Sequence, residues 1–207
     1  MKKLLFLILV LSVAASSIYA QTFTEAPELF SDSLKGISGS TFQWGDYDND
    51  GDLDLFAGSW VYRNDSGTFS NDSSMSHPGS KFELGDFDND GDLDFVTNAF
   101  ESRPTGGVYH LIIYRNDGNV FTDIGAPDPV VEAATFDWGD FDNDGDLDLL
   151  ISGYIPWTGN VTRIYENKNG DFNNYISLPG ANGSATWGDF DNDGDLDILV
   201  TGQKKDT

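Results

Sequence analysis

One acidic nine-residue segment has the residue types and spacing to do chemistry, and it occurs four times in the chain. The first copy reads Asp46-Tyr47-Asp48-Asn49-Asp50-Gly51-Asp52-Leu53-Asp54, and it recurs from Asp86, Asp140 and Asp189 with Phe for Tyr at the second position. Five carboxylates in nine residues repel one another, so the segment is electrostatically unfavourable without a counter-ion. The four copies hold 20 of the 35 acidic residues, which concentrates the acidity at four places.

The spacing of these carboxylates fits a calcium loop. Side chains at positions 1, 3 and 5 can point at one centre, the glycine at position 6 permits a sharp turn, and position 9 closes the cage. Position 7 is expected to act through its backbone carbonyl, so its side chain is the least secure ligand. All are hard oxygen donors, which favour Ca²⁺ over softer metals and over Mg²⁺ with its stricter octahedral geometry. The sequence therefore predicts about four Ca²⁺ ions, one per loop. The candidate ligands are Asp46, Asp48, Asp50, Asp52, Asp54, Asp86, Asp88, Asp90, Asp92, Asp94, Asp140, Asp142, Asp144, Asp146, Asp148, Asp189, Asp191, Asp193, Asp195 and Asp197.

Alternative types of loop fit the motif less well. A polar hairpin turn without a metal needs only Asn-Asp-Gly, but four copies with identical spacing favour the metal. An EF-hand requires flanking helices and a Glu at position 12. Thrombospondin-type calcium repeats contain Cys, which this chain lacks, and glycine-rich toxin-type repeats would recur every nine residues. Position 12 of the four copies is Ala57, Thr97, Ile151 and Val200.

Short apolar runs flank each loop and must position it. The first loop lies between Thr41-Phe42-Gln43-Trp44-Gly45 and Leu55-Phe56-Ala57-Gly58, and the other copies have similar flanks. Such runs, bounded by Gly and Asn-Asp, are typical of strands. Four strands per unit of about 40 to 50 residues indicate a β-propeller blade. The third strand of a unit is expected at Val61 to Asn64, Ile113 to Asn116 and Ile164 to Asn167. The short fourth strand that follows is expected to contain Phe69, Phe121 or Phe172, respectively.

The repeat also suggests places for the aromatic residues and the longer connections. We expect Trp44, Trp138 and Trp187 to lie in the core, and the residues at loop positions 2 and 8 to anchor each loop there. The unequal spacing of the loops arises between the second and third strands. Asn98 to Gly107 and Tyr154 to Asn160 are therefore expected to be longer loops.

Composition limits the partners of the chain. Its 207 residues carry 11 Lys and Arg against 35 Asp and Glu, a formal charge of -24 at pH 7. A phosphate backbone is bound mainly by Lys and Arg, so nucleic acid is excluded as a partner, and anionic membranes are disfavoured for the same reason. The absence of Cys excludes disulfides, thiolate metal sites and Cys nucleophiles. The 28 aromatic residues supply enough core material to argue against disorder.

The N-terminal 20 residues have the pattern of a cleavable signal peptide. Met1-Lys2-Lys3 is a positive segment, Leu4 to Ala15 is apolar, and Ser16 to Ala20 leads to a cleavage point before Gln21. The alternative is a membrane anchor, but the apolar run is shorter than the roughly 20 residues that span a bilayer. The sequence predicts residues 1–20 as the leader of a secreted, periplasmic or cell-surface protein. The mature segment, 21–207, has no second apolar run of that length.

The acidic loop with its following apolar strand resembles the FG-GAP/VCBS repeat family, whose blades occur in integrin alpha-subunit heads and in many secreted bacterial proteins. The similarity covers residues 21–207, with loops at 46–54, 86–94, 140–148 and 189–197. The resemblance implies an all-β fold, a β-propeller of four-stranded antiparallel blades in which each loop joins the first two strands and binds Ca²⁺.

The number of motifs departs from that family, because such propellers usually have seven blades and this chain has four motifs. Thr22-Phe23-Thr24 resembles a fourth strand, and the last unit stops before its third strand. We therefore expect an incomplete seven-bladed ring, truncated at its C-terminus or completed by a partner chain; a closed four-bladed ring would lack one strand.

The functional hypothesis is a non-catalytic module that binds protein or carbohydrate ligands through loops on the propeller faces, as in adhesion. Phe100 to Val108 and Tyr154 to Asn160, with Trp157, are candidate ligand surfaces, although Trp157 could equally be a packing residue. The alternatives are a polysaccharide lyase of the propeller type, or a fragment of another carbohydrate-active enzyme, and a purely structural spacer. No catalytic base is evident, because His77 and His110, the two histidines, are expected in surface loops.

Overall fold

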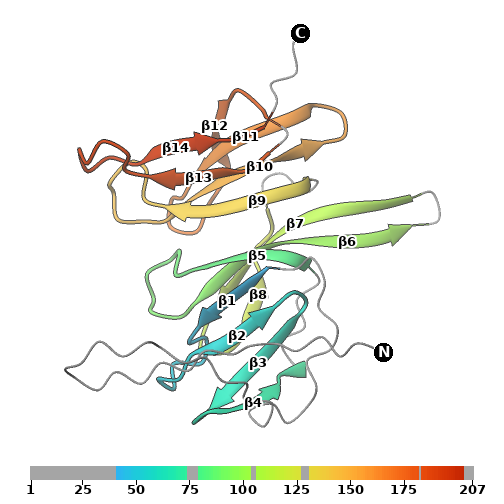
Figure 1. Cartoon of the computed structure of the whole chain (residues 1–207), viewed down its shortest axis with the longest axis vertical. Helices are drawn as coiled ribbons and strands as arrows, with labels where there is room; N and C mark the ends of the chain where they lie inside the picture. The colour runs from blue at the N-terminus through green and yellow to red at the C-terminus, as the bar shows by residue number, and fades with distance from the viewer. Residues whose placement is uncertain (1–40, 74–78, 104–105, 127–130, 182, 203–207) are drawn as a thin grey trace, which may run out of the picture.

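The computed structural model describes residues 41–73, 79–103, 106–126, 131–181 and 183–202, and these ranges contain fourteen strands and no α-helix. The strands form three four-stranded sheets and one two-stranded sheet (Figure 1). Their bounds are β1 Phe42–Gly45, β2 Asp54–Ala57, β3 Trp60–Asp65, β4 Thr68–Asn71, β5 Gly79–Gly85, β6 Asp94–Arg103, β7 Gly106–Asn116, β8 Phe121–Asp123, β9 Glu132–Gly139, β10 Asp148–Ile155, β11 Gly159–Glu166, β12 Asn174–Leu178, β13 Ala185–Gly188 and β14 Asp197–Val200.

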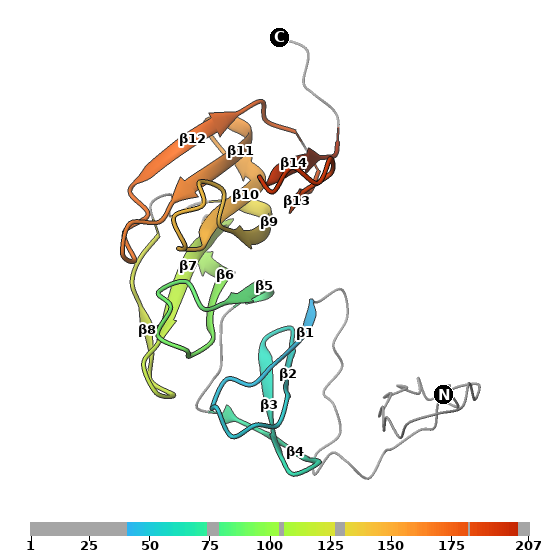
Figure 2. The same cartoon turned by 90° about the vertical axis from the view of Figure 1, so that its left-hand side faces the viewer.

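Every sheet is an antiparallel meander in which sequence neighbours pair. The orders are β1-β2-β3-β4, β5-β6-β7-β8, β9-β10-β11-β12 and β13-β14. The first strands of successive sheets contact one another, β1 with β5, β5 with β9, and β9 with β13. The sheets consequently follow one another in chain order along the molecule, as Figures 1 and 2 show from two directions. This arrangement confirms the prediction of propeller blades, and the four sheets do not form a closed ring.

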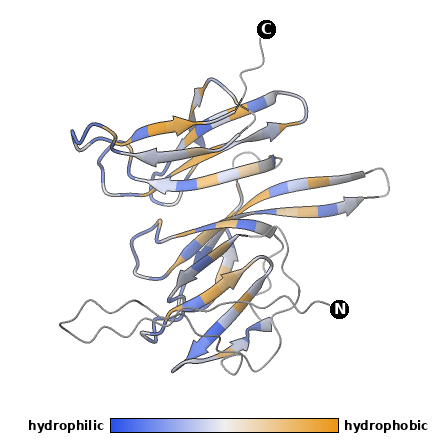
Figure 3. Cartoon of the chain, viewed as in Figure 1, coloured by the Kyte–Doolittle hydropathy of each residue, from blue (hydrophilic) through white to orange (hydrophobic). Residues whose placement is uncertain are grey.

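The apolar faces of neighbouring sheets pack on each other. The largest cluster lies between the second and third sheets and contains Phe87, Ile113, Val131, Leu149 and Tyr165, each nearly inaccessible to solvent. Burying one such side chain contributes about 1.5–3 kcal/mol, so these interfaces are the main source of stability. Smaller clusters connect the first sheet to the second and the third to the fourth. Figure 3 shows apolar segments interspersed with hydrophilic ones on the strands, and mostly hydrophilic colour in the acidic loops.

Two connections that the sequence indicated as long loops are mostly strand. β6 and β7 pair from Phe95↔Tyr114 out to Arg103↔Gly106, so most of the segment from Asn98 to Gly107 is a protruding hairpin. β10 and β11 pair out to Ile155↔Gly159. The prediction was wrong because an extension beyond the packed sheet faces solvent on both sides, and its polar residues resemble a loop. His110 lies on β7, not in a loop.

The tryptophan prediction holds only in part. Trp138 and Trp187 are half-buried against neighbouring clusters, whereas 49% of the Trp44 surface is exposed, so its placement in the core was wrong. The anchors at loop positions 2 and 8 differ in the same way. Tyr47 and Phe87 are buried, but Phe190 and Leu53 are exposed. These residues are covered only where a neighbouring sheet lies against them.

Three sequence predictions fall outside the described residues: the leader over 1–20, the strand at Thr22 to Thr24, and the position of His77. Within the described ranges there is no helix with the length and hydropathy that a membrane span requires.

Candidate metal centres

Each acidic loop connects the first strand of a sheet to its second strand, and all twenty candidate ligands lie there or at the first residue of the second strand. The backbone enters the left-handed region twice in every loop. Asn at position 4 has φ of 57–59° and Gly at position 6 has φ of 94–98°. Asn tolerates this region and Gly adopts it freely, so Asn-Asp-Gly allows nine residues to fold back sharply.

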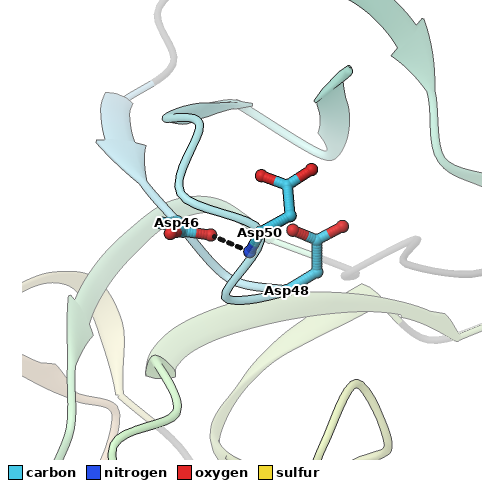
Figure 4. Close-up of side chains that lie close together, drawn as sticks. All are labelled: Asp46, Asp48 and Asp50. Carbon is cyan, nitrogen blue, oxygen red and sulfur yellow. Dashed lines mark hydrogen bonds between the residues drawn. The ribbon is translucent and has the colours of Figure 1, made fainter. Parts of the chain in front are cut away.

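The carboxylate at position 1 holds each loop closed. Asp46 accepts a hydrogen bond at Oδ1 from the Asp50 backbone N–H (3.1 Å) and at Oδ2 from that of Gly51 (2.9 Å). Figure 4 shows the first of these bonds. The same two bonds form in the other loops, accepted by Asp86, Asp140 and Asp189.

Three carboxylates converge in every loop, with one oxygen from each lying within 4.8 Å of the others. Positions 1 and 3 belong to all four clusters. The third member is Asp50 or Asp90 at position 5 in the first two loops. In the last two it is Asp148 or Asp197 at position 9. The structure therefore brings the predicted residues together in each loop, although not always the same three.

The carboxylates at position 3 are the strongest indication of a cation. Oδ1 of Asp48 and Oδ1 of Asp88 are buried and have no hydrogen-bond partner among the described residues. Burial raises the pKa of both carboxyls, and the neighbouring carboxylates at positions 5 and 1 raise it further. A buried acceptor without a donor is costly, and a divalent cation would satisfy these oxygens. The donor set fits Ca²⁺.

The carboxylate at position 9 connects the loop to the third strand. Asp94 is fully buried; its Oδ2 accepts from the Phe87 backbone N–H (2.9 Å) and its Oδ1 from that of Asn116 (2.8 Å). Burial raises the pKa of Asp94 to about 7, although these two donors oppose the shift. Asp54 and Asp148 make the same two bonds, and burial raises the pKa of each to about 6.

The side chain at position 7 connects neighbouring loops. The Asn89 amide donates to Oδ1 of Asp146 (3.1 Å), and the Asn143 amide donates to Oδ1 of Asp195 (3.0 Å). Asn49 makes the equivalent bond to Asp92, whose Oδ2 also accepts from the Gly118 backbone N–H (2.6 Å). These side chains therefore connect successive loops, and the expectation that position 7 offers its backbone carbonyl to an ion stays a prediction.

The asparagine at the end of each third strand, or one residue from it, was not among the predicted site residues. The Asn167 amide donates to the carbonyls of Phe87 (2.7 Å) and Leu147 (3.0 Å), and its Oδ1 accepts from the Gly170 backbone N–H. Asn116 makes the corresponding bonds in the second sheet. The signal was present in the sequence, since Asn64, Asn116 and Asn167 recur in register after Tyr-x.

Outside the loops, the described residues offer few groups for chemistry. His110 pairs with Glu101 (2.8 Å) on the protruding β6–β7 hairpin. A shallow hollow of about 340 Å³, lined by residues 124–126 and 170–173, contains one carboxylate, Asp171. Trp157, in the β10–β11 turn, is 85% exposed.

Comparison with known proteins gives one family. The model of the FG-GAP-like repeat matches three overlapping or adjacent stretches, residues 46–97, 86–151 and 153–200. Each stretch begins at or before an acidic loop and includes the strand that follows it. Among curated proteins, none matches the chain.

Proposed function

The chain belongs to the FG-GAP-like repeat family, and from that premise we propose that it is an exported, calcium-binding propeller module. We infer that it binds a protein or carbohydrate ligand and catalyses no reaction. FG-GAP-like repeats are typically non-catalytic and occur typically in extracellular proteins. In this proposal residues 1–20 are a leader and residues 21–207 form the module.

The observation that carries the calcium proposal is the pair of buried oxygens on Asp48 and Asp88, which have no hydrogen-bond partner among the described residues and each lie near two further carboxylates. Ca²⁺ would be bound by side chains at positions 1, 3, 5 and 9 and by the backbone carbonyl at position 7. This assigns all twenty loop aspartates to about four sites, with those at position 7 contributing only main-chain oxygen. When bound, the ion neutralises the mutual repulsion of the loop carboxylates.

The role of the ion is structural. The loop carboxylates already hold the first, second and third strands of a sheet together through positions 1 and 9. An ion bound between them would tighten the same connections, and the next loop is connected through position 7. Binding to the folded form alone stabilises it by mass action.

The ligand surface is proposed on the opposite side of the sheets, where the hairpins differ. The β6–β7 hairpin extends far beyond its sheet, and Phe100 and Tyr109 pack against each other there (5.0 Å between ring centroids) while remaining partly exposed. Trp157 presents a nearly free indole in the neighbouring hairpin. Exposed aromatic rings of this kind bind sugars and protein partners.

Thermal unfolding in EGTA, in Ca²⁺ and in Mg²⁺ tests the calcium role. We expect chelation to lower the melting temperature strongly, Ca²⁺ at about 10⁻⁴ to 10⁻³ M to restore it, and Mg²⁺ to restore it less. Asp48→Ala should lose part of the Ca²⁺ response, whereas the matched control Asp65→Ala, in the same sheet but outside the loop, should retain it. A melting curve that does not change across the Ca²⁺ titration would contradict the proposal.

A further inference from the structure

Each of the three four-stranded sheets has an ion pair beside its acidic loop, and the order of charge in this pair differs between sheets. The pair consists of the residues just before and just after the third-strand asparagine (Asn64, Asn116 or Asn167), and we call it the flanking pair. In the first two sheets the basic residue comes first, whereas in the third the acidic residue comes first. The pairs are Arg63 with Asp65 (2.8 Å), Arg115 with Asp117 (2.9 Å) and Glu166 with Lys168 (2.9 Å).

The hydrogen bonds of the asparagine place the three flanking pairs alike. Its backbone N–H donates to Oδ1 of the aspartate at loop position 9 over 2.8 Å in all three sheets. In the first sheet the residue before the asparagine, Arg63, has its Nε 4.0 Å from Oδ2 of Asp48, the carboxylate at loop position 3. In the third sheet the same place is occupied by Glu166, whose side chain is 27% exposed against 56% for Lys168. A cation therefore lies next to position 3 in one case and an anion in the other.

The carboxyl groups at position 3 respond to this difference. Desolvation raises the pKa of Asp48, Asp88 and Asp142, and the carboxylate at position 5 adds to the rise in each loop. Arg63 opposes the rise at Asp48, and Arg115 opposes it at Asp88. Glu166 instead adds to the rise at Asp142. The third loop consequently has an extra negative charge at the place where the first two have a positive one.

This difference matters for a divalent cation bound among the loop carboxylates. A guanidinium beside position 3 repels such an ion and partly neutralises the loop when the ion is absent, whereas a carboxylate there attracts the ion. Arg63 does not take the place of the ion, because Oδ1 of Asp48 remains buried without a hydrogen-bond partner among the described residues. Lys168 lies near the third loop as well and partly offsets Glu166, so the difference between the loops is moderate.

On the basis of the proposed calcium function, we propose that the residue before the third-strand asparagine sets the Ca²⁺ affinity of each loop. The third loop, beside Glu166, binds Ca²⁺ more tightly than the first and second loops, beside Arg63 and Arg115. As the Ca²⁺ concentration rises, the third loop is filled before the other two.

A Ca²⁺ titration of the full chain followed by ¹⁵N NMR tests the order of filling. The glycine at position 6 reports on its own loop, since its backbone N–H bonds to the carboxylate at position 1. We expect the Gly145 signal to reach its midpoint at a Ca²⁺ concentration lower, on the order of 3- to 10-fold, than the Gly51 and Gly91 signals, because charges at the surface act through partly screened water.

Exchanging the two charges of a flanking pair tests the cause. Glu166→Arg combined with Lys168→Asp gives the third sheet the charge order of the first two without changing the net charge. We expect the Gly145 midpoint to move to a higher Ca²⁺ concentration, on the order of 3- to 10-fold. The reciprocal exchange, Arg115→Glu with Asp117→Lys, should lower the Gly91 midpoint by a similar factor. The glycines of the unchanged loops serve as controls within each variant and should keep their midpoints.

The outcomes separate this proposal from the calcium function itself. Signals that respond to Ca²⁺ with equal midpoints in the three loops, or midpoints that stay in place when the charges are exchanged, would overturn the affinity difference and leave the calcium function intact. Equal movement of all three midpoints in one variant would also overturn it, because the flanking pair would then not act on its own loop. Loop glycines that do not respond to Ca²⁺ would overturn both proposals.

Discussion

The strands of each sheet are connected at two opposite ends, and these differ in construction. We call the end with the acidic loops the loop edge, and the end where the second and third strands are joined the hairpin edge. On one edge, four loops of identical length are held by the same hydrogen bonds from backbone N–H groups to carboxylates at positions 1 and 9. On the other edge the hairpins differ, because the second strands of the complete sheets have 4, 10 and 8 residues. The loop edge is built alike in every sheet and the hairpin edge varies, so the proposed ligand surface lies away from the acidic loops.

The largest effect is expected from removing a buried carboxylate on the loop edge. Asp94→Ala leaves the backbone N–H groups of Phe87 and Asn116 buried without acceptors. Each such loss costs about 1–3 kcal/mol, so we expect destabilisation of about 3–5 kcal/mol in urea unfolding with saturating Ca²⁺.

The matched control is Asp117→Ala, which removes an exposed carboxylate paired with Arg115 (2.9 Å). It should change stability by less than about 1 kcal/mol. Equal losses of stability in the two variants would contradict the role given to the buried loop carboxylate.

Two asparagine variants test the contact between neighbouring sheets. The Asn167 side chain reaches the loop of the preceding sheet, whereas among the described residues the Asn64 side chain reaches only its own loop. The Asn167 amide donates to carbonyls of two loops and the Asn64 amide to one carbonyl, that of Leu53. We expect Asn167→Ala to cost about 2–3 kcal/mol and Asn64→Ala about 1–2 kcal/mol. Chemical denaturation of both variants measures the difference, and equal losses would contradict the role given to the contact between sheets.

The carboxylate of Glu83, on β5, gives the comparison a test through the pH dependence of stability. Burial raises the pKa of Glu83 to about 7, with Asp137 adding to the rise and a hydrogen bond from Gln43 opposing it. The folded form therefore holds a proton that the unfolded chain releases near pH 4.5, so this group lowers stability as pH rises from about 4.5 to 7. Glu83→Gln should remove that decline, for a relative gain on the order of 1–2 kcal/mol at pH 8 after allowance for solvent screening. A parallel pH profile for variant and parent in saturating Ca²⁺ would contradict the assignment.

The smallest stability effect is expected on the hairpin edge. Trp157→Ala removes an 85% exposed ring and should change the free energy of unfolding by less than about 0.5 kcal/mol. If this edge binds carbohydrate, the same variant should lose binding on a glycan array while its Ca²⁺ response remains. A large loss of stability would show that Trp157 is a packing residue.

The repeat made much of the fold predictable from the sequence. Identical loops with apolar flanks implied one structural unit four times; the family match and three four-stranded sheets confirm the unit, and the described part of the fourth contains its first two strands. The loop that joins the first two strands was also placed correctly, as the resemblance to the repeat family implied, and its Asn and Gly adopt the left-handed backbone that a sharp turn requires.

Features that depend on neighbouring sheets could not be predicted from the repeat. Trp44 and Trp138 occupy equivalent places, yet only Trp138 packs against a preceding sheet, where it stacks on Phe87 (5.8 Å). The hairpin from β6 to β7 was taken for a loop because its residues contact solvent on both faces. The aspartate side chain at loop position 7 accepts a hydrogen bond from an asparagine more than 40 residues earlier in the chain.

The number of Ca²⁺ ions bound per chain tests the central claim most directly. Equilibrium dialysis of the full chain, followed by elemental analysis, should give about four ions per chain, one per loop. Asp88→Ala should reduce the number to about three while leaving the other loops occupied. A count below one ion per chain, or an unchanged count in Asp88→Ala, would contradict the assignment of the acidic loops as calcium sites.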